Sequence, residues 1–214
     1  MEQITVHEAI DRDMDLAWTL SHFGKEAHIY GEGDPSENVY QVLTGAIRSC
    51  KLLSDGRCQI TAFHFPGDIL DFDVKDFHTT SAEAIVKTIV RTINRNRLQQ
   101  AALVNPALGS ELWILIGNKL RHVETHLLLL GRQTALERVV AFLVEMDERL
   151  KGDGTLPLPM RRRDIADYLG LTLETVSRVL SSLHEDGIIG FAGDARQILL
   201  RDRNRFRHNL QRSD

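Results

Sequence analysis

The hydrophobic pattern of the chain changes its period near residue 106. Between about residues 25 and 96, short apolar stretches partly alternate with polar residues and are separated by glycines. This pattern is typical of the short strands of an all-β sandwich or barrel. Between two of the stretches, Asp55-Gly56 predicts a hairpin turn. The predicted strands cover VYQVL (39–43), AIRSCKLL (46–53), CQITAFHF (58–65) and AEAIVKTIVRTI (82–93).

From about Ala107 to Leu150 the apolar residues recur at helical spacing, with a break. Five of them step by four, three, four and three residues, which is the pattern of a coiled-coil seam. We therefore expect this helix to pack against a second copy of itself; the alternative is a long core helix within one chain. Leu112 would extend the seam by one step, and Trp113 beside it is expected in the core. The seam consists of Ile116, Leu120, Val123, Leu127 and Leu130.

A turn-rich linker at 151–159 precedes a second compact unit. Arg162–Leu169 has the pattern of a short helix, and Gly170 permits a positive φ in the turn that follows. Thr172 is the expected N-cap of a second helix, which has one apolar face and ends before Gly187. Two short strands around a glycine-containing turn come next. This order of elements predicts a winged helix-turn-helix.

Polar side chains gather at the start of the second helix. In a helix-turn-helix the N-terminal residues of this helix lie against base edges in the major groove. An arginine there can donate two hydrogen bonds to guanine, and a glutamate can accept one from cytosine. Arg162 and Thr172 are better suited to phosphate contacts or capping. The candidate DNA-binding residues are therefore Glu174, Ser177, Arg178, Thr172, Thr175 and Arg162.

The composition is that of an ordinary soluble protein, with 43% hydrophobic and 26% charged residues in a chain of 214. No apolar run approaches the roughly 18 residues of a membrane span, and the acidic N-terminus lacks a signal-peptide core. Two cysteines cannot form a disulfide framework. We expect a cytoplasmic protein without a membrane partner.

The charge is unevenly distributed along the chain. The formal net charge is −4, but residues 151–214 carry 11 basic and 9 acidic side chains, a net of +2. The first 150 residues therefore carry −6. An acidic body with a locally basic C-terminal unit is compatible with binding to double-stranded DNA.

The chain resembles the CRP/FNR superfamily of bacterial transcription regulators, most closely its FixK-like branch. The resemblance extends from about Ala27 to Leu200, and Glu174, Ser177 and Arg178 match the base-reading residues of the family. The stretches that carry it are YGEGDPSENVYQVLTGAIR, SDGR, FPGDI, LGRQTALERVVAFL, LPMRRRDIADYLGLTLETVSRVLSSL and GIIGF.

This resemblance implies an α+β fold: an N-terminal β-roll of the jelly-roll, cyclic-nucleotide-binding type, a long dimerisation helix and a C-terminal winged helix-turn-helix. The expected boundaries are 1–106, 107–150 and 151–214. It also implies a homodimer that binds a palindrome near TTGAT-N4-ATCAA and recruits RNA polymerase. In the FixK-like branch the expected targets are genes of microoxic respiration or nitrogen fixation.

Two departures from the family pattern are visible. Members that sense oxygen directly have an N-terminal cysteine cluster, whereas the first 24 residues here contain no cysteine. Because an iron–sulfur cluster usually needs four thiolates, none is expected. Asp71 stands where the family commonly has glycine, which puts the local loop, a candidate polymerase-facing surface, in question.

A ligand-gated sensor of the same architecture, with cyclic nucleotide or haem, is the alternative function. Cyclic-nucleotide binders of this superfamily carry an Arg-Ser or Arg-Thr pair at the phosphate, but residues 79–82 read Thr-Thr-Ser-Ala. We therefore expect no cofactor. The absence of P-loop and GxSxG motifs argues against an enzyme. His122 and His126 share a helix face but lack the HExxH arrangement, so no metal site is expected.

Overall fold

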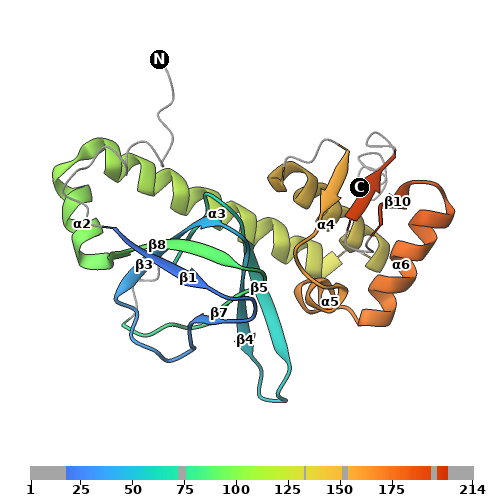
Figure 1. Ribbon diagram of the computed structural model, residues 1–214, viewed down its shortest axis with the longest axis horizontal. Coiled ribbons are helices and arrows are strands. Elements are labelled where there is room, and N and C mark those ends of the chain that lie inside the picture. The colour runs from blue at the N-terminus through green and yellow to red at the C-terminus, as the bar shows by residue number, and fades with distance from the viewer. Residues whose placement is uncertain (1–17, 72–75, 133, 151–153, 194–196, 202–214) are drawn as a thin grey trace. The chain divides into compact units, whose positions relative to one another are not determined.

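The structure is a computed structural model that describes residues 18–71, 76–132, 134–150, 154–193 and 197–201 (Figure 1). The chain divides into two compact units, residues 1–52 with 61–125 and residues 53–60 with 126–214. The cysteine-free N-terminal stretch and the arginine-rich tail after residue 201 lie outside the described residues.

The first unit contains two four-stranded antiparallel sheets, in the orders β1-β8-β3-β6 and β2-β7-β4-β5. The apolar stretch 82–93, predicted as one strand, forms two strands in different sheets. The chain bends between them at residues 85–87, and there the buried Thr88 hydroxyl donates to the Val86 carbonyl oxygen (2.8 Å). The strands are β1 (Thr19–Phe23), β2 (His28–Tyr30), β3 (Asn38–Thr44), β4 (Ile47–Leu52), β5 (Cys58–His64), β6 (Ile69–Leu70), β7 (Ser81–Ala84) and β8 (Thr88–Asn94).

The sheet that contains β3 and β8 is buried on both faces. Successive strand residues point to opposite faces, so the neighbours Ile69 and Leu70 belong to different core clusters. One cluster joins the two sheets, and the other packs against α2 (Arg95–Val104) and the start of α3 (Pro106–Arg132) (Figure 1). The sequence did not predict α2, because Leu98 is its one buried residue and its helical period is weak.

The predicted hairpin joins β4 and β5, with its closing pair shifted by one residue. Leu53 donates its N–H to the Arg57 carbonyl oxygen (2.8 Å), whereas a two-residue turn centred on Asp55-Gly56 would pair Leu53 with Cys58. The resulting three-residue loop places Gly56 at φ 80°, a left-handed conformation that glycine adopts without strain. Neither Cys50, which is buried, nor Cys58, which is half-buried, is in a disulfide.

Asp71, the departure from the family glycine, has a left-handed backbone with φ 66°. This conformation explains why glycine suits the position. The buried Asp71 carboxylate accepts a hydrogen bond from the Ser36 hydroxyl (2.6 Å) and lies 3.2 Å from Nδ1 of His78 and 3.9 Å from Nη2 of Arg95. The side chain thus adds a buried polar cluster that a glycine could not form.

The second unit is built from helices and a small sheet. The predicted break in the long helix lies between α3 and α4 (Ala135–Leu150), where Thr134 caps α4 and accepts the N–H of Glu137 (3.3 Å). Part of the predicted linker instead forms a third strand, because Leu156 is buried and pairs with Ile198. The remaining elements are β9 (Thr155–Pro157), α5 (Arg162–Leu169), α6 (Leu173–Glu185), β10 (Ile189–Phe191) and β11 (Gln197–Leu200), with sheet order β10-β11-β9.

Candidate DNA-binding interface

The segment from α5 to α6 has the geometry of a helix-turn-helix. Gly170 ends α5 in the left-handed conformation (φ 62°), and the N–H of Leu171 bonds to the Ala166 carbonyl oxygen (3.0 Å). Thr172 then caps α6, since its hydroxyl oxygen accepts the N–H of Thr175 (3.2 Å). The predicted N-cap and the predicted turn glycine are both confirmed.

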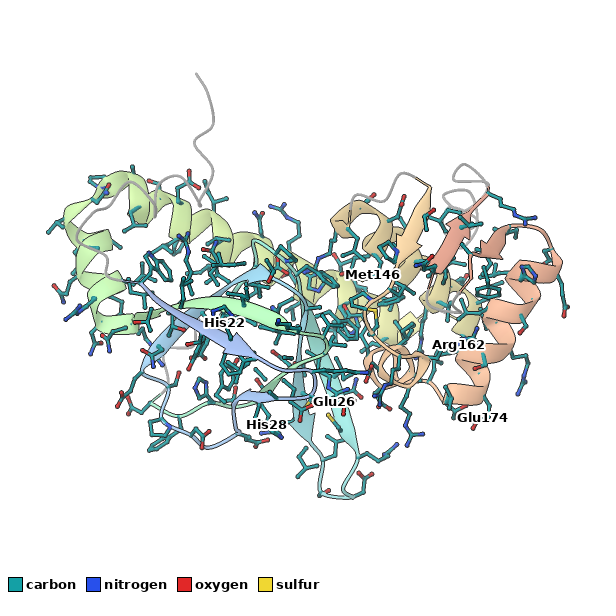
Figure 2. The ribbon with its side chains drawn as sticks, in the orientation of Figure 1. His22, Glu26, His28, Met146, Arg162 and Glu174 are labelled. Atoms are coloured by element: carbon teal, nitrogen blue, oxygen red, sulfur yellow. The ribbon has the colours of Figure 1, made fainter. Side chains whose placement is uncertain are left out.

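One face of α6 is buried and the opposite face is exposed at its N-terminal end. Val176, Leu180 and Leu183 face the core of the second unit. Glu174 and Arg178 are exposed and lie one helical turn apart, and Figure 2 shows Glu174 at the start of α6. Thr175 and Ser177 are half-buried, and the Thr175 hydroxyl lies 3.0 Å from that of Thr172. Of the six predicted DNA-binding residues, Thr175 and Ser177 are therefore less accessible to DNA than Glu174 and Arg178.

Glu174 is held in its charged form. Its own backbone N–H at the helix start, then the Thr172 hydroxyl and the charge of Arg163, hold the pKa of the Glu174 carboxyl below its ordinary value. An ionised carboxylate can accept a hydrogen bond from the cytosine amino group. Arg163 was not among the predicted site residues; its place within a run of three arginines was the only signal in the sequence.

Arg162 packs against the wing. Its guanidinium carbon lies 5.6 Å from the centroid of the Phe191 ring, within the range of a cation–π contact. The ring of His184, near the end of α6, lies 5.1 Å from the same ring. Arg162 is half-buried and therefore has a packing role beside its predicted phosphate contact (Figure 2).

The predicted seam on α3 is largely exposed within one chain. Ile116, Leu120, Val123 and Leu127 are all exposed, and Leu130 is half-buried. Two neighbouring predictions were wrong. Leu112 packs against the core of the first unit, and Trp113, expected in the core, is 77% exposed. Because Trp113 lies three residues before Ile116, it continues the seam in place of Leu112.

One of the two histidines on α3, His126, packs against an aromatic ring. His126 stacks on Tyr168 with the ring centroids 4.2 Å apart. Within the described part of the chain, no three side chains of the metal-binding types come together. No described helix is both long and apolar enough to cross a membrane.

The first unit has an open cavity of about 510 Å³. The described lining residues include Lys51 but no arginine. The Lys51 ammonium donates to the Thr79 carbonyl oxygen (3.0 Å) and pairs with Glu32, which also lines the cavity together with Asp76. A cavity whose lysine is already paired and whose other charges are carboxylates fits a cyclic phosphate poorly.

Comparisons with known proteins match both units to known domain types. Residues 20–105 match the cyclic nucleotide-binding domain, and residues 137–208 match the Crp-like helix-turn-helix domain. The chain is 45% identical to the nitrogen fixation regulation protein FixK of Rhizobium meliloti, over 79% of this chain and 77% of the relative. It is 42% identical to FixK of Azorhizobium caulinodans, over 88% and 78%.

Solved structures of similar proteins have the same fold as this chain. FixK2 from Bradyrhizobium japonicum is 55% identical, with a TM-score of 0.86 over 91% of this chain and 98% of that chain. A CooA mutant from Carboxydothermus hydrogenoformans, 23% identical, shares the fold with a TM-score of 0.75 over 90% and 88%. The predicted fold class is thus confirmed, and the chain is a DNA-binding transcription regulator rather than an enzyme. It belongs to the CRP/FNR family and, within it, to the FixK-like branch.

Proposed function

We propose that the chain acts in the cytoplasm as a homodimer that binds a palindrome near TTGAT-N4-ATCAA and activates transcription by recruiting RNA polymerase. Its targets are genes of nitrogen fixation, as the names of its FixK relatives suggest, or of microoxic respiration, as the resemblance to the FixK-like branch implies. The proposal divides the chain into residues 1–106, a dimerisation helix at 107–150 and a DNA-binding unit at 151–214.

The observation that carries the proposal is the exposed end of α6. Glu174 and Arg178 extend from one face, one turn apart, at the end of the helix that enters the major groove in this motif. No described residue forms a hydrogen bond or an ion pair with Arg178, so its guanidinium is available for the two acceptors of guanine. Glu174, charged at neutral pH, suits the cytosine of the same base pair.

The seam supports the dimer. Four exposed apolar residues in register along one face of α3 form a surface that monomeric proteins seldom leave open. A twofold dimer through this helix would present two copies of α6, and a palindrome has the matching symmetry. The half-sites would then be about one helical turn, roughly 34 Å, apart.

The decisive experiment is binding to operators that carry each of the four base pairs at the G·C position, at two salt concentrations. Arg178→Ala should cost about 1–3 kcal/mol per half-site and flatten the preference at that pair. Glu174→Ala should change preference there more than it changes affinity. Arg162→Ala is the comparison variant: it should weaken all sequences alike and reduce the salt dependence, because it removes a predicted phosphate contact and the packing on Phe191, and neither reads a base.

If Arg178→Ala weakens every operator by the same factor, Arg178 contacts phosphate and the base readout lies elsewhere. Selection of bound sequences from random DNA tests the palindrome independently. A selected site without twofold symmetry would contradict the proposed dimer on DNA.

We propose that activity needs no bound cofactor. The charges that line the cavity, Glu32, Lys51 and Asp76, support this choice over a cyclic nucleotide as effector. A haem would reveal itself as visible absorbance of the purified protein. A cyclic nucleotide would reveal itself in a calorimetric titration, and either result would favour the sensor.

A further inference from the structure

One side chain in the second unit joins the C-terminal ends of two helices. Arg138 lies in the first turn of α4 and points its guanidinium at backbone carbonyls. Its Nη2 donates to the carbonyl oxygen of Leu130, near the end of α3, at 2.7 Å. Its Nη1 donates to the carbonyl oxygen of Leu169, the last residue of α5, at 3.1 Å.

These acceptors are groups that a helix itself leaves unsatisfied. The last four carbonyls of an α-helix have no partner within the helix, and they carry the negative end of its dipole. A guanidinium offers several donors in a rigid plane and can bond to two acceptors in different directions. Arg138 therefore caps α3 and α5 with one positive charge and fixes the distance between their ends.

The surroundings of Arg138 connect the seam to the DNA-binding motif. Leu130 is the last residue of the seam, and Gly170 is the first residue of the turn before α6. A Cβ placed on Gly170 would lie 3.8 Å from Nη1 of Arg138 and 3.9 Å from Cδ2 of Leu130. We call Leu130, Arg138, Leu169 and Gly170 the Arg138 joint.

An aromatic stack supports the same joint. The ring of Tyr168, next to Leu169, is buried and stacks on His126 of α3. Phe142 of α4 contacts Tyr168 with the ring centroids 5.9 Å apart. Three helices thus meet around the end of α5. The short capped turn that follows transmits the orientation of that end to α6.

We propose that Arg138 is a positioning residue for DNA binding, which sets the orientation of α6 relative to the end of the seam. This inference rests on the proposed function, because it needs a dimer that binds two half-sites. The angle at the Arg138 joint determines the spacing between the two copies of α6. It does not determine how one α6 contacts its own half-site.

The test compares palindrome and half-site binding for three variants. Arg138→Met keeps most of the length of the side chain but removes all donors. Arg138→Lys keeps the charge but loses the planar fork. Arg57→Met removes the same charge from the tip of the β4–β5 hairpin, where Arg57 is exposed and pairs with Asp55, and serves as the control. Binding is measured to duplexes of equal length that carry the TTGAT-N4-ATCAA palindrome, the same palindrome with one base pair added or removed, or a single half-site. Molecular mass in solution is measured in parallel.

Arg138→Met should remain a dimer and bind the half-site within about threefold of wild type, which also shows that α5 and α6 are folded. Its affinity for the palindrome should fall at least tenfold, and its preference for the natural spacer should flatten. Arg138→Lys should be intermediate, and Arg57→Met should match wild type.

Three results overturn the inference. Equal losses of affinity for the palindrome and for the half-site would mean that Arg138 only supports the fold of the helix-turn-helix. Unchanged palindrome binding and unchanged spacer preference would mean that the joint sets no spacing. If wild type itself binds the palindrome no better than the half-site, the proposed function fails as well, and the wild-type arm alone reveals this.

Discussion

Replacing Leu127 by Glu should separate the dimer into single chains. Leu127 lies in the seam and is 69% exposed in one chain. Full burial of a leucine side chain stabilises by about 1.5–3 kcal/mol, so covering this fraction contributes about 1–2 kcal/mol per chain. The twofold symmetry of the dimer doubles the contribution to about 2–4 kcal/mol.

The glutamate adds a further cost. Two carboxylates would meet near the twofold axis, and each would lose water without gaining a partner of opposite charge. Together the two effects amount to at least about 4 kcal/mol, which raises the dissociation constant of the dimer about 1,000-fold. Binding to the palindrome should fall with it, since one chain then reaches only one half-site.

The adjacent residue provides a matched control. Leu128 is 62% exposed and lies about 100° further round the helix, off the seam. Leu128→Glu changes the charge equally and should leave the dimer intact. Sedimentation velocity over a range of protein concentrations measures both variants. The argument fails if Leu127→Glu stays dimeric wherever wild type does, or if Leu128→Glu dissociates to the same extent.

Two further predictions concern stability. Asp71→Ala should lower the free energy of unfolding in urea by about 1 kcal/mol more than Asp71→Gly does, because alanine tolerates the φ of 66° less well than glycine. Both variants lose the carboxylate that accepts from Ser36, so the difference between them reports the backbone alone. Equal losses would mean that the backbone at residue 71 is unstrained. Burial, followed by the Glu145 charge, raises the pKa of Tyr168 well above its ordinary value of 10.0, so folding favours the neutral phenol. The free energy that Tyr168 contributes should therefore be fully present below about pH 10 and be lost as the pH rises further, and Tyr168→Phe should reduce the alkaline loss of stability in thermal unfolding curves.

The sequence predicted those structural features that depend on the spacing of neighbouring residues. The apolar positions of α6, its N-cap Thr172 and the turn glycine Gly170 are local features, and the structure has each of them. The division of 82–93 into two strands was not predictable in this way. An alternating apolar pattern looks the same with or without the bend, which the structure places next to the buried hydroxyl of Thr88.

The residues that sequence reasoning missed act through contacts distant in the chain. Arg163 affects Glu174 across the turn, and Arg138 joins carbonyls 8 residues before it and 31 residues after it. Trp113 shows the opposite error: an aromatic residue next to a seam suggests a core position, yet the core of the first unit takes Leu112 instead. Periodicity alone cannot decide which of two adjacent apolar residues faces the sheet and which faces outward.

The proposed function has a consequence for how such a regulator is controlled. Without an effector, the active species is the dimer, and its amount is set by mass action. Below the dissociation constant of the dimer, doubling the chain concentration raises the dimer concentration about fourfold, because two chains combine. The seam then does more than hold the two copies of α6 together. Its strength sets the concentration range in which the protein changes from inactive to active, and Leu127 and Leu130 contribute to that range directly. Arg138 bonds only to the backbone carbonyl of Leu130, which a side-chain substitution keeps, so a substitution at Leu130, like one at Leu127, should alter dimer affinity and leave that hydrogen bond of the Arg138 joint in place.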